Sequence, residues 1–334
     1  MNQSIWQPQY YIRPFNPELD ILGLVTLRAE IETVDQVGTN TSEAAVQAQM
    51  KWLGHDPAKD RWVAESSDPS DKFVGHAWIF AQSPKRSILS VGVHPAWRRK
   101  GIGKSLLTRA LDRAKEHGAS QVVSATEANN TSGDAFLRHH GFSPAGHNRF
   151  LMAPADLSPQ EPGWPAGYAV RSFSEVQDLS VLVQACNRCY KDMWGHRENT
   201  ELSTEKFYDD LMKQYPDLFP PEGIFITFAP DQTIAGVCFS RIEDQQKIID
   251  SPAVIPAYRQ QDLQRPLILA AMRWLNTQAK GGFQLQTWGD NERAVRIYHE
   301  LGFTLDEKNH TVEYLWNGDS PGAYILASKR KNNA

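Results

Sequence analysis

The chain has 334 residues, of which 41% are hydrophobic and 22% charged, and its formal net charge is -4 at pH 7. A length above the usual single-domain size predicts two domains, and the balance of apolar and charged residues is that of a globular protein rather than a disordered or fibrous one. The net negative charge argues against a general nucleic-acid binder, so we expect no nucleic-acid partner.

Cysteine content and hydropathy indicate the cellular setting of the protein and argue against metal binding and membrane association. Three cysteines are too few and too odd in number for a disulfide framework, which favours a reducing, cytoplasmic setting. Cys186 and Cys189 have metal-like spacing but no second ligand pair nearby, so we expect no metal. The N-terminus carries no basic-then-apolar signal peptide, and no segment reaches the roughly 18 apolar residues of a membrane helix, so we expect no membrane association.

The two halves of the chain begin with similar sequences. Residues 11–15 (YIRPF) and 169–173 (AVRSF) each have the pattern of an opening strand. Between them, four prolines within 152–167 resist both a helix and a central strand, and they predict a stiff linker. We therefore expect a first domain at 1–153, a linker at 154–166, a second domain at 167–328 and a solvated basic tail at 329–334.

Strand and helix signals alternate in the same order in both halves. An apolar run ended by Pro95 predicts a strand at 87–93, and apolar residues at helical spacing predict a helix at 102–117. A strand at 121–125 and a short helix at 134–140 follow. The second half repeats this order with a strand at 247–249, a helix at 263–278, a strand at 283–287 and a helix at 292–301. The alternation predicts an α/β fold with a mixed (α+β) sheet that contains at least one parallel strand pair.

Two sequence landmarks recur at one fixed spacing. Pro95-Ala96-Trp97-Arg98 is matched by Pro256-Ala257-Tyr258-Arg259, and Gly141-Phe142 is matched by Gly302-Phe303. Because both matches lie 161 residues apart, no insertion or deletion separates the landmarks in either copy. We interpret the chain as two fused copies of one fold.

A basic glycine loop joins the first predicted strand and helix of this pattern. It reads Arg98-Arg99-Lys100-Gly101-Ile102-Gly103-Lys104. The glycines let the backbone approach a ligand closely, and the N-terminus of the following helix adds unsatisfied N–H donors. The basic side chains suit a pyrophosphate, so the loop has the character of an anion cradle. It does not have the spacing of a Walker loop, and a solvated basic turn is the alternative interpretation of this segment taken alone.

The whole set of motifs resembles the GCN5-related N-acetyltransferase (GNAT) family, in its tandem, mycothiol-synthase-like form. The first copy fits the family signature at Val93-His94-Pro95, Arg98 to Gly103, Asn130 and Gly141-Phe142. The second copy fits it partly, at Val254-Ile255-Pro256, Arg259, Asn291, Tyr298 and Gly302-Phe303. The resemblance implies two tandem acetyltransferase domains that use acetyl-CoA and no metal.

The departures from the family pattern assign different roles to the two copies. The resemblance implies that the first copy binds the coenzyme through Val91, Gly92, Val93, Arg98, Arg99, Lys100, Gly101, Ile102, Gly103, Lys104 and Asn130. The second copy has Asp262 and Gln264 in place of Gly101 and Gly103, so we expect its loop to bind pyrophosphate poorly. Conversely, the family often uses a tyrosine to protonate the departing thiolate; the second copy has this residue, Tyr298, whereas the first has Leu137.

Three residues are candidates for catalysis. Tyr298 is the candidate acid, Glu127 could accept the amine proton beside the coenzyme site, and Asp250 lies on a strand that faces the analogous site of the second copy. A solvated carboxylate is the alternative for both acidic residues. The resemblance implies direct acetyl transfer by a monomer or homodimer to an amine, either on a small molecule or at a protein N-terminus or lysine. Catalysis around Tyr298 and a non-catalytic acyl-CoA sensor are the alternative functions.

Overall fold

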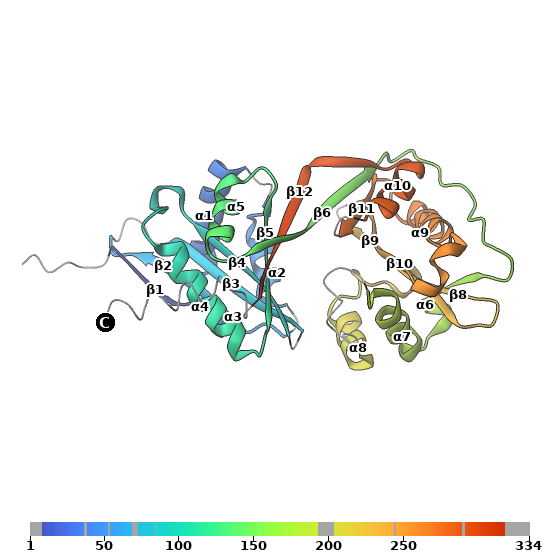
Figure 1. The fold of residues 1–334 in the computed structure, drawn as a ribbon, viewed down its shortest axis with the longest axis horizontal. Helices are drawn as coiled ribbons and strands as arrows, with labels where there is room; N and C mark the ends of the chain where they lie inside the picture. Colours follow the sequence, from blue (N-terminus) through green and yellow to red (C-terminus); the bar gives the residue numbers. More distant parts are fainter. Residues whose placement is uncertain are drawn as a thin grey trace, which may run out of the picture. The chain divides into compact units, whose positions relative to one another are not determined.

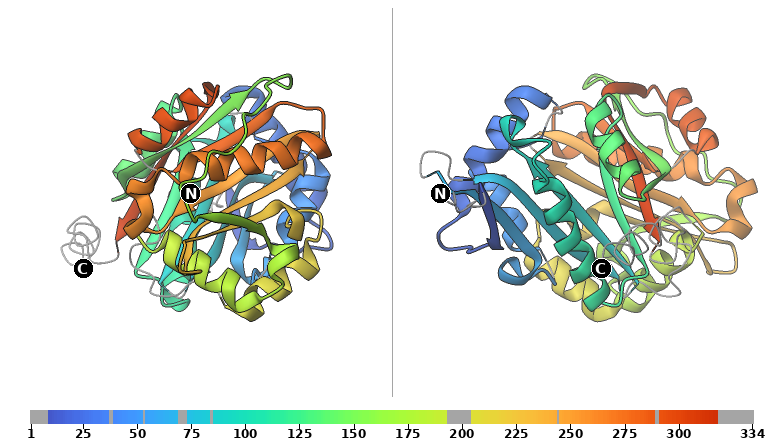
Figure 2. Two further views of the ribbon diagram at one scale, coloured as in Figure 1. Left: turned by 90° about the vertical axis from the view of Figure 1, so that its right-hand side faces the viewer. Right: turned by 60° about the vertical axis from the view of Figure 1, so that its left-hand side comes forward.

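The computed structural model describes residues 9–36, 39–52, 54–68, 73–83, 85–192, 204–243, 245–288 and 291–317 (Figures 1 and 2). The predicted basic tail at 329–334 and the end of the predicted second domain lie outside these residues. The chain divides into two compact units, one formed by Met1–Ala145 with Val312–Ala334 and the other by Gly146–Thr311. No helix in the described part of the chain is both long and apolar enough to cross a membrane.

The first unit is a sheet with helices on both faces. Its elements are β1 (Tyr10–Pro14), α1 (Ile21–Asp35), α2 (Glu43–Met50), α3 (Pro57–Asp60), β2 (Arg61–Ser66), β3 (Phe73–Ser83), β4 (Arg86–Val93), α4 (Ile102–Glu116), β5 (Gln121–Glu127) and α5 (Thr131–His139). The strand order is β1-β2-β3-β4-β5, followed by β12 (Thr304–Asn317). Neighbours from β1 to β4 are antiparallel, whereas β4 and β5 are parallel.

Alternation along the strands of the first unit builds one core on each face of the sheet. In β2, Trp62 and Ala64 belong to a core that α4 covers, whereas Val63 belongs to a second core with α1 and α2. The helical spacing seen in the sequence gives α4 its apolar face, which buries Ile102, Leu106, Leu107, Ala110 and Ala114. The helices α1 and α4 therefore cover opposite faces of one sheet.

The second unit repeats this arrangement. Its elements are β7 (Ala169–Ser172), α6 (Phe173–Val176), α7 (Leu179–Tyr190), α8 (Glu205–Gln214), β8 (Ile224–Phe228), β9 (Ile234–Glu243), β10 (Gln246–Val254), α9 (Gln264–Gln278), β11 (Phe283–Trp288) and α10 (Glu292–Glu300). The strand order is β7-β8-β9-β10-β11, followed by β6 (Ser143–Ala153), and β10 and β11 are the parallel pair. The predicted mixed α/β fold with two tandem copies is confirmed, and the predicted strands and helices appear with shifted ends, most clearly at β10, which continues to Val254 beyond the predicted 247–249.

Each half of the chain gives its last strand to the unit formed mainly by the other half. Strand β6 pairs with β11, from Ala153 opposite Phe283 to Asn148 opposite Trp288. Strand β12 ends in the first unit, where Tyr314 and Trp316 join the core beneath α4. This division differs from the predicted domain bounds, which assign 143–153 to the first domain. The proline-rich segment that follows β6 cannot add a further strand, so another part of the chain completes the first sheet.

We predict that the end of β12 stabilises the first unit. Trp316 is 6% exposed in the core beneath α4, and Trp316→Ala should cost about 3–5 kcal/mol because a large aromatic side chain leaves a cavity. Hydrogen exchange should show lost protection in α4 and retained protection in α9. The matched change Trp274→Ala, next to the core of the second unit, should give the reverse pattern. Equal loss in α4 and α9 for both variants would contradict the separate packing of the two cores.

Candidate functional site

Strands β4 and β5 separate soon after they begin. They pair over three positions, from Arg86 opposite Gln121 to Ile88 opposite Val123. Beyond this point β4 stays paired with β3 as far as Val93. The N–H of His94 donates to the carbonyl of Val74, and by alternation the backbone of Val91 points away from β3, into the opening between β4 and β5. An extended ligand with amide groups can pair with the strand there.

The glycine loop begins α4 beside this opening. Gly101 is the N-cap residue of α4 and has a φ of 86°, a left-handed conformation that favours glycine. At Gly103, an added β-carbon would lie 3.1 Å from the ring of Phe136 and 3.5 Å from the side chain of Val93. The missing side chain thus lets α4 approach β4 and α5 closely. The first turn of α4 has free N–H groups, which are suited to binding an anion.

Arg98 has an internal role in the structure. Its guanidinium donates to the carbonyl of Val93 at 3.2 Å and to the carboxylate of Asp35 at 2.6 Å. The second unit has the same pair of interactions, because Arg259 donates to the carbonyl of Val254 at 3.0 Å and to the carboxylate of Asp192 at 2.6 Å. In both units the arginine joins the end of the strand to the segment at the end of the first long helix. The residue therefore supports the loop from inside.

The other basic residues of the loop lie at the surface. The ammonium group of Lys100 lies 4.1 Å from the ring centroid of Trp97, a cation–π contact. Arg99 has a φ of 65° and, like Lys104, is exposed. Arg99 and Lys104 are thus the predicted basic residues with side chains accessible to a phosphate beside the N-terminus of α4.

Two further residues that we predicted as coenzyme contacts have structural partners. The side-chain oxygen of Asn130 accepts from the N–H of Gly133 at 2.9 Å and caps α5, as Asn291 caps α10. A β-carbon at Gly92 would lie 2.6 Å from the imidazole of His76, so this glycine faces α1 and lets it pack on β4. Asn130 and Gly92 place the neighbouring helices on either side of the opening.

Glu127 lies on the α1 face of the sheet. The hydroxyl of Thr126 lies next to Gly133 of α5, so the adjacent Glu127 points to the opposite face. Burial, and then the negative charge of Glu32 on α1, raise the pKa of Glu127 to about 7. A half-buried carboxyl that titrates near neutral pH can accept a proton from an amine. Sequence reasoning missed Glu32, because only packing of α1 on the sheet brings it near β5.

The equivalent opening in the second unit is filled by a side chain. Strands β10 and β11 also pair over three positions, and a β-bulge bends β10 between Asp250 and Ala253. Gln264, which takes the place of Gly103, directs its side-chain amide at the carbonyl of Pro252 (3.4 Å) and the hydroxyl of Tyr298 (3.3 Å). The Pro252 carbonyl thus accepts a hydrogen bond from Gln264, at the position equivalent to Val91 of the first unit.

Tyr298 is enclosed in the second unit. It is 3% exposed, and burial raises the pKa of its hydroxyl well above the ordinary value. In the first unit, Leu137 at the equivalent position is also buried and offers no proton.

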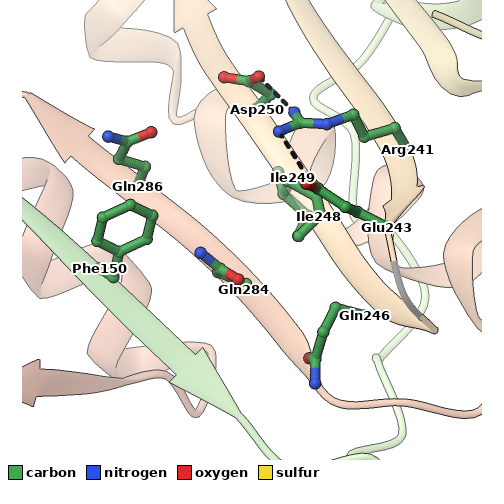
Figure 3. Close-up of a pocket in the computed structure, with 9 residues that line it drawn as sticks. All are labelled: Phe150, Arg241, Glu243, Gln246, Ile248, Ile249, Asp250, Gln284 and Gln286. Carbon is green, nitrogen blue, oxygen red and sulfur yellow. Dashed lines mark hydrogen bonds and ion pairs between the residues drawn. The ribbon is translucent and has the colours of Figure 1, made fainter. Parts of the chain in front are cut away.

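Asp250 lies in a pocket of about 440 Å³ in the second unit (Figure 3). The pocket is lined by residues of β6, β9, β10 and β11, namely Phe150, Arg241, Glu243, Gln246, Ile248, Ile249, Asp250, Gln284 and Gln286. Arg241 points at Asp250 and pairs with it at 2.6 Å, and the hydroxyl of Ser251 donates to the same carboxylate. The ion pair engages the Asp250 carboxylate in an internal contact, which weakens the case for this residue as a base.

Comparison with known proteins finds one family twice in the chain. Residues 27–142 and 182–303 each match the model of the acetyltransferase (GNAT) family. The two matches end just before β6 and β12, the strands that the two halves exchange. The matched segments therefore contain both openings, both loops and the helices around them.

Relatives and solved structures agree with this match over most of the chain. The chain is 27% identical over 259 residues to the mycothiol acetyltransferase of Rhodococcus jostii, covering 72% of this chain and 78% of the relative. It is 25% identical to that of Frankia alni, with 94% of each covered. A GCN5-related N-acetyltransferase from Sphaerobacter thermophilus has a TM-score of 0.74 at 18% identity, over 93% of this chain and 96% of that one. A tandem GNAT protein from the clavulanic acid biosynthesis pathway has a TM-score of 0.64 at 15% identity, over 93% and 99%.

We predict that Glu32 controls the titration of Glu127. Glu32→Gln removes a negative charge and should lower the pKa of Glu127 from about 7, while burial keeps it above the reference value of 4.5. Between these two pH values the folded state holds a proton that the unfolded chain releases, so stability falls as the pH rises through this range. Carbon-detected NMR of the glutamate carboxyls would follow the shift. Glu116→Gln, on the exposed end of α4, is the control, and an unchanged Glu127 titration in Glu32→Gln would contradict the coupling.

Proposed function

Because the chain belongs to the acetyltransferase (GNAT) family and is an N-acetyltransferase, we propose that it transfers the acetyl group of acetyl-CoA directly to an amine at one site, in the first unit. The observation that carries this assignment is the contrast between Gly103 and Gln264. The glycine has no side chain to occupy the opening beside α4, whereas the glutamine amide occupies the equivalent position at 3.4 Å from a strand carbonyl.

The first unit offers a fitting partner for each part of the coenzyme. The N-terminus of α4, with Arg99 and Lys104 exposed beside it, suits the pyrophosphate. The backbone of Val91, which points into the opening, suits the amides of the pantetheine arm. The thioester then lies where the opening leads to the α1 face and to Glu127. We assign the coenzyme contacts to Val91, Val93 and the loop from Arg99 to Lys104, with Gly92, Arg98 and Asn130 as supporting residues.

The residues around the opening account for the transfer of the acetyl group. The amine nitrogen bonds to the acetyl carbonyl carbon and the carbon–sulfur bond breaks, which releases the coenzyme thiolate. Glu127, in its charged form, takes the proton that the amine loses. A backbone N–H of β4 that points into the opening can stabilise the oxyanion of the transition state. The thiolate, with a reference pKa near 8.5, can take its proton from water, so Leu137 does not prevent turnover.

Two alternatives have weaker support. Catalysis in the second unit would use Tyr298, but this residue is 3% exposed and its hydroxyl accepts from Gln264. A non-catalytic acyl-CoA sensor would explain Leu137 but gives no role to a carboxyl that titrates near pH 7 at the opening. Relatives named mycothiol acetyltransferase support a small-molecule acceptor over a protein N-terminus or lysine.

We predict one coenzyme A site per chain, and exchange of two equivalent residues tests it. Gly103→Gln gives the first unit the side chain that the second has, and it should weaken coenzyme A binding at least about tenfold, because the added side chain meets Phe136 and Val93 or fills the opening. Gln264→Gly is the matched control and should leave the affinity of the first site unchanged. Calorimetry gives both the affinity and the stoichiometry. Two equal sites in the unaltered protein would refute the assignment.

We also predict that Glu127 contributes more to turnover than Tyr298. Glu127→Gln should reduce kcat by about 10²–10⁴-fold, the usual contribution of a general base, whereas Tyr298→Phe should reduce it less than about threefold. In the unaltered protein kcat should rise with pH through an apparent pKa near 7 and lose this rise in Glu127→Gln. Thiol release from acetyl-CoA measures both effects. A large loss in a folded Tyr298→Phe variant would move catalysis to the second unit.

A further inference from the structure

Two arginines lie close together on the α1 face of the first unit. Arg61 on β2 is 2% exposed, and Arg28 on α1 is half-buried. Both guanidinium groups approach the side-chain oxygen of Gln49, Arg28 at 3.3 Å and Arg61 at 3.5 Å. Arg61 also donates to the imidazole of His55 at 2.8 Å, and Arg28 donates to the backbone carbonyl of Asn40 at 3.3 Å. All of these partners are uncharged oxygen or nitrogen acceptors.

In the part of the chain that the structure describes, neither guanidinium forms an ion pair. Asp60, which precedes Arg61, directs its carboxylate at Arg113, 2.8 Å away. Two positive charges therefore share one neutral acceptor in a poorly solvated place. Like charges that are buried together repel each other and lose hydration, so a bound anion would recover free energy at this position.

The surroundings supply only part of the compensating charge, because Asp60 acts on Arg61 through space while its carboxylate pairs with Arg113. Burial and the two arginines lower the pKa of His76 to about 3, so its imidazole is neutral at physiological pH. Burial and Arg28 lower the pKa of Arg61 to about 10, so it remains charged. The rings of Trp52 and Trp78 lie 5.6 and 5.9 Å from the Arg61 guanidinium and hold it by cation–π contacts. Both rings are half-buried, which leaves a partly exposed aromatic surface next to the charged pair.

The position of the pair relates it to the proposed chemistry. Arg28 and Glu32 are four residues apart on α1, which is about 6 Å along the helix axis. Glu32 lies near enough to Glu127 to raise its pKa. The helix α1 thus presents two groups on the same face of the sheet. One is the carboxyl group of Glu32, close to Glu127, where an amine can lose its proton, and the other is the guanidinium group of Arg28. The proposed phosphate site at the N-terminus of α4 lies on the other face.

We propose that Arg28 and Arg61 bind an oxyanion group, a carboxylate or a phosphate, on the acceptor whose amine is acetylated. This inference rests on the proposed function for the identity of the ligand, but the anion site itself does not. The carboxyl groups of Glu32 and Glu127 attract the amine of such a molecule and repel its oxyanion. The two arginines attract the oxyanion and repel the amine. The site therefore orients an acceptor that carries both groups, and it selects against amines without an anionic group.

An anion titration tests the site without acetyl transfer. Sodium sulfate, compared with sodium chloride at equal ionic strength, should raise the melting temperature of the protein when coenzyme A already saturates the glycine loop. Arg28→Gln should lose this gain and should bind sulfate at least about tenfold more weakly. Without sulfate the variant should melt at or above the temperature of the unaltered protein, because one of two repelling charges is gone. The control Arg109→Gln, on the exposed face of α4, should respond to sulfate as the unaltered protein does.

The outcome separates anion binding from a purely structural role. A structural role predicts that Arg28→Gln melts at a lower temperature in both salts while its gain from sulfate stays the same, and this result would overturn the proposal. No sulfate effect in the unaltered protein would also overturn it.

Matched amines then identify the acceptor class. β-Alanine against ethylamine tests a carboxylate, and O-phosphoethanolamine against ethanolamine tests a phosphate. We expect at least an about tenfold preference in kcat/KM for one anionic member over its neutral partner, and we expect Arg28→Gln to lose this preference. Equal rates within both pairs would refute acceptor recognition. Absence of turnover with all four amines would instead count against the proposed function, and the melting assay with the same compounds would still show whether the anionic members bind.

Discussion

The short parallel pairing of β4 with β5 is the constraint on which the site depends. Pairing stops at Ile88 and Val123, and beyond that point each strand is held by a different neighbour, β4 by β3 and β5 by β12. The opening that results exposes the backbone of Val91 to a ligand beside the N-terminus of α4. In the proposed function, a thioester held from the α4 face reaches Glu127, which lies on the α1 face.

The second unit shows how the same fold keeps its structure while the opening is closed. Its parallel pair is equally short, and Arg259 ties the strand end to Asp192 just as Arg98 ties it to Asp35. The difference is that the Gln264 amide satisfies the Pro252 carbonyl. A backbone carbonyl that a bulge turns away from its strand partner needs a hydrogen-bond donor. In the second unit the Gln264 side chain provides that donor, whereas the first unit has Gly103 at the equivalent position and no side chain there to provide it.

The sequence predicted the features that depend on local pattern and on the repeat. The helical spacing of α4, the strand before it and the fixed offset between copies were sufficient for the fold class and for the loop at Gly101. Exchange of β6 and β12 could not be predicted, because an isolated strand pattern does not say which sheet it joins. The same holds for Arg98, whose charge suggests a phosphate contact until Asp35 is seen beside it. Glu32 and the Arg28–Arg61 pair arise only when α1 packs on the sheet.

The charges on the α1 face set a condition on the acceptor that the fold alone does not. Burial and the charge of Glu32 raise the pKa of Glu127, which makes Glu127 a better proton acceptor at neutral pH. The same burial and negative charge disfavour an anionic ligand beside Glu127. Arg28, about one helical turn from Glu32, and the neighbouring Arg61 create the opposite condition. A neutral molecule would compensate neither the repulsion between the guanidinium groups nor their lost hydration. An acceptor with an oxyanion compensates both, and because the oxyanion is fixed at the arginines, its amine is directed toward Glu127. Binding and orientation then come from the same pair of charges.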